Sequence, residues 1–523
     1  MSLVGRSLIW VHRYLGTALS LLFVMWFLTG IGMIYSRGMP RLSADVRLAR
    51  LPVLDMTQVR LTLAEAAERA EATAYLEQAV LLTVMDRPAY RFTDPVPITV
   101  FADTGELLGE VGPGQAAKIA SRFMNLPEDR VRHLRLLDEP DQWTLTQRRR
   151  LPLHKISVED AAGTELYVSP SLGEVVVVTT RASRTLAWVS TIPHWLYFAP
   201  LRVHNDLWRK VVLWTSGLGC GLALLGLVLA VLRFKPSRPF RLSRVSSYIP
   251  YSGLMKWHYI TGVLFGVLTL TWVFSGMLSM EPWYWSSNDG GLDEGVDRAF
   301  AAGPLDPSRF PAMAPPAWKH VLEGRPVKEI EFTQILGNPH YVVRSAPEQP
   351  PEPGWPDGGH QPYYVMRGGT GQERLIIAAD PLKLRRESFS TESILSRLKK
   401  EIPDAPIAES ELLTEYDSYY YSRDRQARLP VLRVKFNNPE KTWLYIDPEV
   451  NSLVAPIHRM NRVERWLYNG LHNLDFPFWY TSRPLWDIGV IVLSLGGAAL
   501  SGIGVFLGFR RALRAGQRIA GFR

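Results

Sequence analysis

The chain has almost no cysteine. Among its 523 residues the only cysteine is Cys220. A disulfide within the chain is therefore impossible, and so is covalent attachment of a haem, which needs a Cys-x-x-Cys-His segment. An iron–sulfur cluster held by cysteines of this chain alone is excluded for the same reason.

Several common catalytic motifs are also missing. We find no His-Glu-x-x-His, Gly-x-Ser-x-Gly or Walker segment, and no Gly-x-Gly-x-x-Gly where a dinucleotide fold would need it. No flavin or nicotinamide domain is recognisable. Any electrons that pass through this chain must therefore come from quinol, from another protein or from a soluble reductase.

Acidic residues are absent from the basic segments beside four long apolar runs. These runs are long enough to cross a bilayer, which takes about 20 residues, and they cover Ser7–Tyr35, Val211–Leu232, Trp257–Met280 and Trp486–Phe509. The first run lacks a small-residue cleavage site, so we interpret it as a retained span and not a signal peptide.

The net charge of +9 is distributed in clusters of Arg and Lys next to the runs. Basic residues favour the cytoplasmic side of a membrane. We therefore expect both termini and the short middle loop to be cytoplasmic, and the two long loops to face the other side. A nucleic-acid partner is not expected, because each basic cluster adjoins a span.

The second half of the chain repeats the first, a feature to be examined before any local motif. One ungapped block recurs at a constant spacing and pairs His12 with His258, Gly16 with Gly262, Trp26 with Trp272 and Gly30 with Gly276. Another block recurs at a longer constant spacing and pairs His194 with His472 and Trp208 with Trp486. Two copies of one histidine about a pseudo-twofold axis suit a bis-histidine metal or haem site.

The first block predicts a histidine-bearing stripe on two of the spans. At about 100° per residue, Gly16, Trp26 and Gly30 return to within about 40° of the His12 direction. The glycine beside the histidine leaves room for a flat macrocycle, and His258 on the facing stripe could ligate the same iron from the opposite side. The alternative is that the small residues only mark helix packing, without a cofactor.

The second block predicts another histidine pair at the opposite face. His194 and His472 precede Trp208 and Trp486 by the same interval, and these tryptophans are placed as interfacial anchors. Prolines interrupt the chain between them, so we expect Leu186–Tyr197 and Arg465–Leu474 to be short helices on the outer surface. These histidines could bind a second haem, or they could simply be hydrogen-bonded within this cap.

The remaining histidines have no histidine partner in the repeat. His204 competes with His194 as a ligand, but it aligns with Ser482, so the symmetry argues against it. We expect the others to be mostly ordinary surface or hairpin residues: His133, His154, His320, His340, His360 and His458.

The two long loops alternate helices with hairpins. In the first loop Leu61–Ala74 and Gln115–Asn125 are predicted helices, each followed by strands, and Thr391–Glu401 is the matching helix of the second loop. Such units predict small α+β modules. A Pro/Gly-rich linker, Pro347–Gly359, divides the second loop.

Several of these segments are typical of one family of membrane proteins. Spans that begin His-x-x-x-Gly, the run Pro193–Tyr197 and the run Leu471–Pro477 are similar to the characteristic segments of the PepSY-associated transmembrane proteins. The resemblance covers nearly the whole chain. Some members of that family resemble inner-membrane siderophore-iron reductases that carry b-type haem, whereas others have no assigned activity.

The expected fold is a membrane α-helical bundle of four transmembrane helices in two tandem repeats, with α+β PepSY-like periplasmic domains. The spans are 1–35, 211–232, 257–280 and 486–509, the periplasmic domains 36–185 and 281–464, the interfacial segments 186–210 and 465–485, and the cytoplasmic loop and tail 233–256 and 510–523.

The expected function is electron transfer across a bacterial inner membrane by two b-type haems. His12 and His258 would ligate the iron of one, and His194 and His472 that of the other. The resemblance implies reduction of a periplasmic ferric chelate, with the donor left open between quinol and a cytoplasmic reductase. The alternative is a non-enzymatic module, anchored in the lipid bilayer, that binds a periplasmic protein or peptide.

Topology gives the first prediction. Reporter fusions after Pro236 and within Pro347–Gly359 should report opposite sides of the membrane, because the basic clusters then all lie inside. Fusions that report the same side for both positions would contradict a four-span arrangement.

Overall fold

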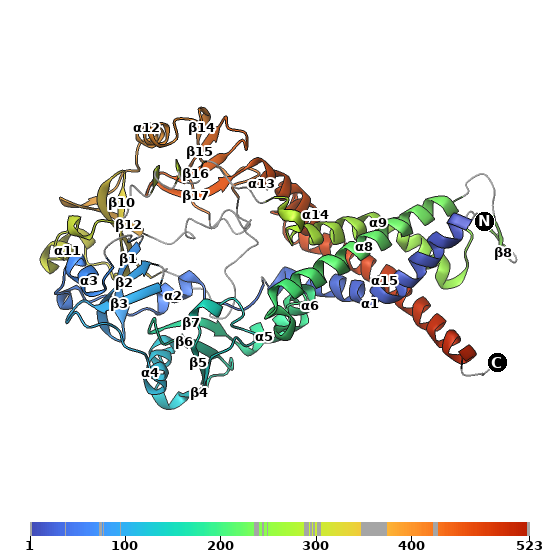
Figure 1. The fold of residues 1–523 in the computed structure, drawn as a ribbon, viewed down its shortest axis with the longest axis horizontal. Helices are drawn as coiled ribbons and strands as arrows, with labels where there is room; N and C mark the ends of the chain where they lie inside the picture. Colours follow the sequence, from blue (N-terminus) through green and yellow to red (C-terminus); the bar gives the residue numbers. More distant parts are fainter. Residues whose placement is uncertain are drawn as a thin grey trace. The chain divides into compact units, whose positions relative to one another are not determined.

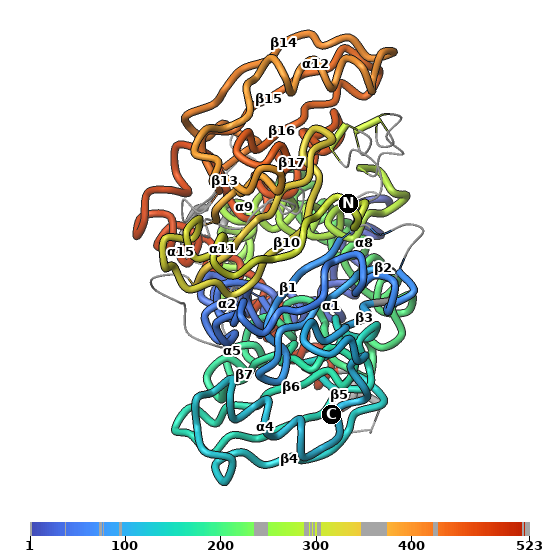
Figure 2. Tube along the Cα trace, turned by 90° about the vertical axis from the view of Figure 1, so that its left-hand side faces the viewer, coloured from blue at the N-terminus to red at the C-terminus, as the bar shows by residue number. Residues whose placement is uncertain are grey.

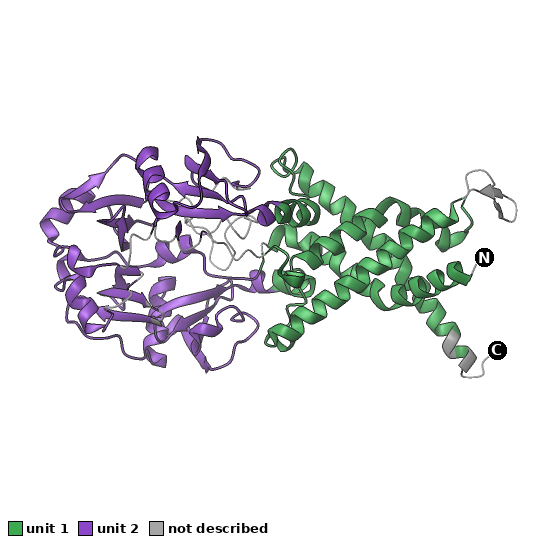
Figure 3. Cartoon of the chain, turned by 45° about the horizontal axis from the view of Figure 1, so that its top comes forward, with its two compact units in different colours: residues 1–38, 185–287, 463–523 green, residues 39–184, 288–462 purple. Residues whose placement is uncertain are grey.

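The computed structural model describes residues 3–36, 38–72, 76, 78–94, 96–234, 240–242, 245–247, 249–286, 292, 295–296, 299–300, 305–346, 374–421 and 427–519. The linker Pro347–Gly359 lies outside the described residues. The chain forms two compact units, coloured separately in Figure 3. Unit 1 comprises Met1–Gly38, Thr185–Ser287 and Val463–Arg523, and unit 2 comprises Met39–Arg184 and Asn288–Arg462.

Unit 1 is a bundle of long apolar helices. In the described part of the chain four helices are long and apolar enough to cross a membrane: α1 (Leu3–Ser36), α8 (Asn205–Arg233), α9 (Gly253–Leu278) and α15 (Leu485–Ile519). Helix α1 packs on α15 and α8 packs on α9, and contacts of α9 with α15 and of α1 with α8 close the bundle (Figure 1). The predicted fold class is therefore confirmed.

Helices α1 and α9 run in the same direction. His12 and His258, early in each helix, have ring centroids 6.3 Å apart. Phe27 and Trp272, later in each helix, have ring centroids 5.8 Å apart. Two helices that meet start to start and end to end are parallel, so the halves are related as parallel repeats. A small hairpin of β8 (Phe240–Leu242) and β9 (Val245–Ser247) lies between α8 and α9 in the sequence.

Short helices close one end of the bundle. The predicted helix Leu186–Tyr197 is divided at Ser190 into α5 (Arg181–Val189) and α6 (Thr191–His194), and α7 (Ala199–Arg202) follows. In the second half α13 (Arg459–Glu464) continues into the π-helix Arg465–Gly470 and α14 (Leu471–Asn473). Equivalent contacts hold the two sides, because α6 packs on α1 and α14 packs on α9.

Unit 2 is built around one sheet to which both loops contribute. Its seven strands are ordered β13-β12-β11-β10-β1-β2-β3, and β1 pairs antiparallel with β10 at the junction (Figure 2). The first loop supplies β1 (Gln78–Val84), β2 (Arg87–Asp94) and β3 (Val96–Phe101). The second supplies β10 (Glu329–Ile335), β11 (Asn338–Arg344), β12 (Arg374–Ala379) and β13 (Leu382–Arg385). The two loops thus form one compact unit.

Helices α3 (Leu63–Arg69) and α11 (Pro315–Leu322) contribute to the apolar core of this sheet. That core contains Tyr90, Phe332, Trp318 and Tyr341, all almost fully buried. The predicted helix Leu61–Ala74 is therefore present but shorter, and it begins with a capping box formed by Thr62 and Glu65.

Each loop adds a helix and a four-stranded sheet, and here the repeat is closest. The first set is α4 (Pro113–Met124), β4 (Val131–Leu137), β5 (Leu153–Val158), β6 (Glu165–Ser169) and β7 (Glu174–Thr179). The second is α12 (Thr391–Glu401), β14 (Ile407–Leu413), β15 (Val431–Phe436), β16 (Trp443–Asp447) and β17 (Ser452–Ile457). The last three strands of each set match end to end at the same spacing that relates His194 to His472.

A buried charge network joins the two loops within unit 2. Arg47, on α2 (Ala44–Arg50), donates from Nε to Glu174 at 3.0 Å and from Nη1 to Glu329 at 2.8 Å. Arg91 also pairs with Glu174. Burial alone would raise the pKa of the Glu174 carboxyl, but the charges of Arg91 and Arg47 outweigh it and hold the pKa at about 2.

Loss of this carboxylate should destabilise unit 2. Glu174→Gln should lower the free energy of unfolding by about 1.5–3 kcal/mol, because both arginines lose a charged acceptor while Arg47 keeps Glu329. Since the folded pKa lies below the ordinary 4.5, the carboxylate stabilises above that pH and its contribution is lost as the pH falls towards 2. Denaturant unfolding of both proteins from pH 7 to pH 3 should therefore show a narrowing difference, and a pH-independent difference would contradict this account.

Candidate functional site

Two pairs of histidines face each other in unit 1. His12 on α1 and His258 on α9 form the inner pair, with ring centroids 6.3 Å apart. His194, at the end of α6, and His472, in α14, form the outer pair, with ring centroids 6.1 Å apart. The structure therefore brings together each pair that the repeat predicts.

The spacing of the rings is informative. A metal–imidazole nitrogen bond is about 2.0 Å long, and the ring centre lies about 1.1 Å behind that nitrogen, so two imidazoles on opposite sides of one metal have centroids about 6.2 Å apart. Both pairs have this separation. This distance suits an ion between the rings, and it also lies within the range of about 4.5–7 Å that directly packed aromatic rings adopt.

The outer pair has its tautomer fixed by its hydrogen-bond partners. His194 Nδ1 lies 3.2 Å from the Trp26 carbonyl oxygen and 3.1 Å from Thr29 Oγ1. The Thr29 hydroxyl donates its own proton to the Met25 carbonyl at 2.7 Å, so its oxygen is an acceptor towards the histidine. Nδ1 must therefore carry the proton, which leaves the lone pair on Nε2, the form that ligates a metal.

The second half reproduces this arrangement. His472 Nδ1 lies 3.1 Å from the Trp272 carbonyl oxygen and 3.2 Å from Ser275 Oγ. The Ser275 hydroxyl donates to the Trp272 carbonyl at 3.0 Å, so it too is an acceptor towards the ring. Burial lowers the pKa of His472, which keeps the imidazole neutral.

One ring of the inner pair is oriented by a carbonyl group of a neighbouring span. His12 Nδ1 donates to the Leu222 carbonyl on α8 at 3.3 Å. The repeat partner of Leu222 is Leu500 on α15, and its carbonyl is the neighbouring acceptor for His258. His258 Nδ1 itself has no hydrogen-bond partner among the described residues, so it lacks the contact that His12 makes with the Leu222 carbonyl.

Glycines leave room for the rings, although only partly where the sequence predicted. A β-carbon at Gly226 on α8 would lie 3.0 Å from His12, whereas one at Gly504 on α15 would first meet Ser20, at 2.7 Å, and would lie at ordinary contact distance, 3.9 Å, from His258. These two glycines are equivalent in the second repeated block, so the sequence contained this signal. A β-carbon at Gly16 or Gly262 would instead meet Leu222 or Leu500, at 3.8 and 3.7 Å.

The residues predicted to form one stripe on each span lie beside two different histidine pairs. A β-carbon at Gly30 would lie 3.5 Å from His194, and one at Gly276 would lie 3.2 Å from His472. The far ends of the stripes thus adjoin the outer pair and not the inner one. From His12 to Trp26, whose carbonyl holds His194, helix α1 rises about 21 Å.

The ring contacts of the outer pair differ between the two halves. Tyr468 stacks on the His472 ring, with centroids 5.3 Å apart and planes inclined by 24°. Its repeat partner is Ser190, so the alignment of the halves could not reveal this contact. Arg465 and Asp475, both fully buried, are linked by a hydrogen bond from Arg465 Nη2 to the Asp475 carbonyl oxygen at 2.7 Å.

The other histidines lie elsewhere. His204 is exposed at the start of α8, whereas His194 faces His472. His133 and His154 are hydrogen-bonded to each other across β4 and β5 at 2.9 Å, and His154 is buried. His340 and His458 are buried as well. His154 and His340 lie in paired antiparallel strands, and His360 lies outside the described residues.

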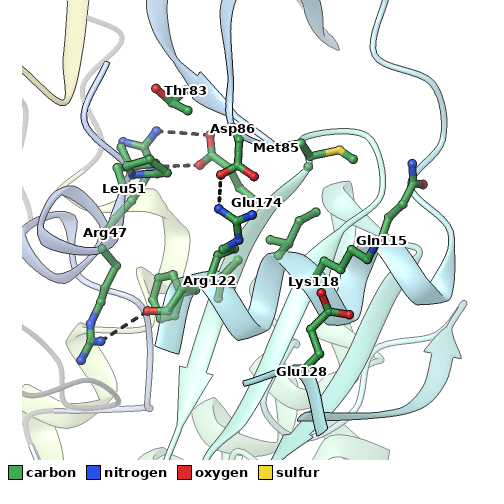
Figure 4. A pocket seen from close by; sticks show the side chains of 16 residues that line it. Arg47, Leu51, Thr83, Met85, Asp86, Gln115, Lys118, Arg122, Glu128 and Glu174 are labelled. Atoms are coloured by element: carbon green, nitrogen blue, oxygen red, sulfur yellow. Dashed lines mark hydrogen bonds and ion pairs between the residues drawn. The ribbon is translucent and has the colours of Figure 1, made fainter. Parts of the chain in front are cut away.

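Unit 2 contains a pocket beside α2 and α4 (Figure 4). Charged side chains line it, but most are paired with one another: Arg47 with Glu174, and Arg122 with Asp86 at 2.6 Å. This self-neutralised lining does not single out one class of ligand. The histidine pairs of unit 1 are the stronger candidate site.

The described part of the chain thus combines four membrane-spanning helices, two pairs of facing histidines and β-sheets formed by the loops. These features are those of a multi-pass membrane protein with large extramembrane domains. The chain matches the family described as "PepSY-associated TM region" over residues 9–511, and it belongs to that family. The resemblance inferred from the sequence is thereby confirmed. No curated protein matches the chain.

The tautomer of the outer pair can be measured without any cofactor. Nitrogen NMR of ¹⁵N-histidine-labelled apoprotein should show His194 and His472 protonated at Nδ1, because the carbonyl oxygens of Trp26 and Trp272 can only accept a hydrogen bond from that atom. Variants His194→Gln and His472→Gln would assign the signals. Protonation at Nε2 in either residue would contradict the hydrogen-bond assignment.

Proposed function

We propose that the protein is a di-haem b electron carrier of a bacterial inner membrane. The observation that carries this proposal is the pair of facing histidines at each of two levels, with centroids 6.3 and 6.1 Å apart. His12 and His258 would hold one haem, and His194 and His472 the other. When bound, haem supplies a one-electron couple whose potential depends on its axial ligands, burial and hydrogen bonds.

The donor set supports haem over a bare metal ion. Among the described residues no group of three or more His, Cys, Asp or Glu side chains could hold a metal. Two imidazoles alone leave most coordination positions of a transition metal unfilled. A porphyrin would bring four nitrogen ligands of its own, so one histidine pair would suffice to hold each haem.

The chain's own residues position the ligands and keep the interior dry. The carbonyl groups of Leu222, Trp26 and Trp272 fix the imidazole planes through Nδ1. An apolar cluster that includes Phe23, Phe27 and Val273 fills the bundle core and excludes water. Low polarity around the ligands favours neutral imidazoles and reduces the reorganisation that accompanies electron transfer.

The substrate that we propose is a periplasmic ferric chelate. Its iron would accept one electron at the outer end of the bundle, and the ferrous product would bind the chelator less tightly. Both termini are proposed to be cytoplasmic and both long loops periplasmic, which places the outer pair at the periplasmic end.

Single histidine substitutions test this function. His12→Ala and His258→Ala should each remove the same haem, and His194→Ala and His472→Ala should each remove the other, because each pair shares one iron. Haem quantitation and redox titration of the four variants should show two classes of loss, each with one low-spin centre retained.

The matched control is His204→Ala, which changes an exposed histidine close to His194 in the sequence and should leave both haems in place. Full haem content in all four test variants, or a parent protein without haem, would instead favour a membrane-anchored module that binds a periplasmic protein or peptide.

A further inference from the structure

The inner end of unit 1 bears cations and no acids. Asp and Glu are absent from residues 1–44, 211–280 and 488–523, which include nearly all of the four spans and the segments that join or follow them on the inner side. The described cations at this end are Arg6, Arg13, Arg233, Lys256, Arg510, Arg511 and Arg514. All except Arg233 are exposed.

Membrane topology does not account for the missing acids. The bias that orients spans counts Lys and Arg, and Asp and Glu contribute little to it. Within the spans acids are rare because ionisable groups are costly there, but in the segments outside them, 1–6, 233–256 and 510–523, acids could be present at no cost to orientation. The like charges are also held near one another, because Arg13 of α1 and Arg511 of α15 are close enough for their charges to interact. Such a surface favours an anionic partner.

The basic end is close to the inner histidine pair. Arg6 precedes His12 by less than two helical turns, about 9 Å along the axis. Arg233 follows Gly226, which adjoins His12, by about 10 Å. Arg510 follows Gly504, which adjoins His258, by about 9 Å. Three helices thus place a cation at one common depth from this pair.

We infer that this inner basic surface is the docking site of an acidic, soluble one-electron carrier protein. The inference rests on the proposed function and names the kind of donor that it needs. A reduced carrier bound here would lose one electron and the inner centre would gain one, with no bond made or broken and no proton moved. Complementary charge would speed encounter and fix the orientation of the carrier.

Binding tests this surface separately from haem chemistry. The full chain in nanodiscs of phosphatidylcholine should bind an acidic [2Fe–2S] ferredoxin, used as the probe, and binding should weaken steeply with added salt. The double variant Arg510→Gln/Arg511→Gln should weaken binding about tenfold at low ionic strength. Lys210→Gln, an exposed cation at the other end of α8, is the matched control and should change nothing.

Each outcome decides the matter. The docking site is overturned if ferredoxin does not bind, or if its affinity is unchanged by salt and by the double variant, even if the protein contains two haems. Loss of ferredoxin binding when phosphatidylglycerol is added would assign these cations to lipid headgroups and also overturn it. Salt-dependent binding to a chain without haem would keep the docking surface while the proposed function fails.

Discussion

The structure of unit 1 depends on one contact made three times, a hydrogen bond from histidine Nδ1 to a main-chain carbonyl oxygen. A carbonyl at a fixed place on a helix cannot turn, so the ring it holds has a fixed direction. The carbonyls of Leu222, Trp26 and Trp272 all belong to helices other than the one that carries the histidine, whereas His258 Nδ1 has no hydrogen-bond partner in the described part of the chain. Helix packing and the direction of the three held rings are therefore one constraint: the bundle cannot shift without turning these rings.

The two halves are not identical around this frame, and both histidine levels show differences. Phe23 and Phe27 of α1 fill the core, with Gly219 and Gly497 opposite them, yet the repeat partners of the two phenylalanines are Thr269 and Val273. Tyr468 lies against the outer pair on one side only. The hydrogen bonds of the outer pair repeat in both halves, whereas at the inner level His12 Nδ1 makes one and His258 Nδ1 has no hydrogen-bond partner within the residues that the structure describes.

Most of the bundle and its histidine pairs could be predicted from the sequence, because the same residues recur in both halves. The spans, both histidine pairs and the α12 helix follow from periodicity and from residues that recur in register. Strand β2, by contrast, includes Pro88, which obscures a strand pattern. Tyr468 has no counterpart of its kind in the other half. The pairing of β1 with β10 places Ala79 opposite Phe332. Hydrophobic periodicity and turn residues predict only local pairing, so they could not identify so distant a partner strand.

That distant pairing has a consequence for synthesis. Strand β1 has β2 on one side as soon as the first loop is made, but its other edge stays open until β10 emerges, two spans later. An open strand edge is prone to pair with other chains. The first loop therefore remains partly folded while α8 and α9 are inserted into the membrane. Unit 2 can complete its folding only after both helices have been inserted.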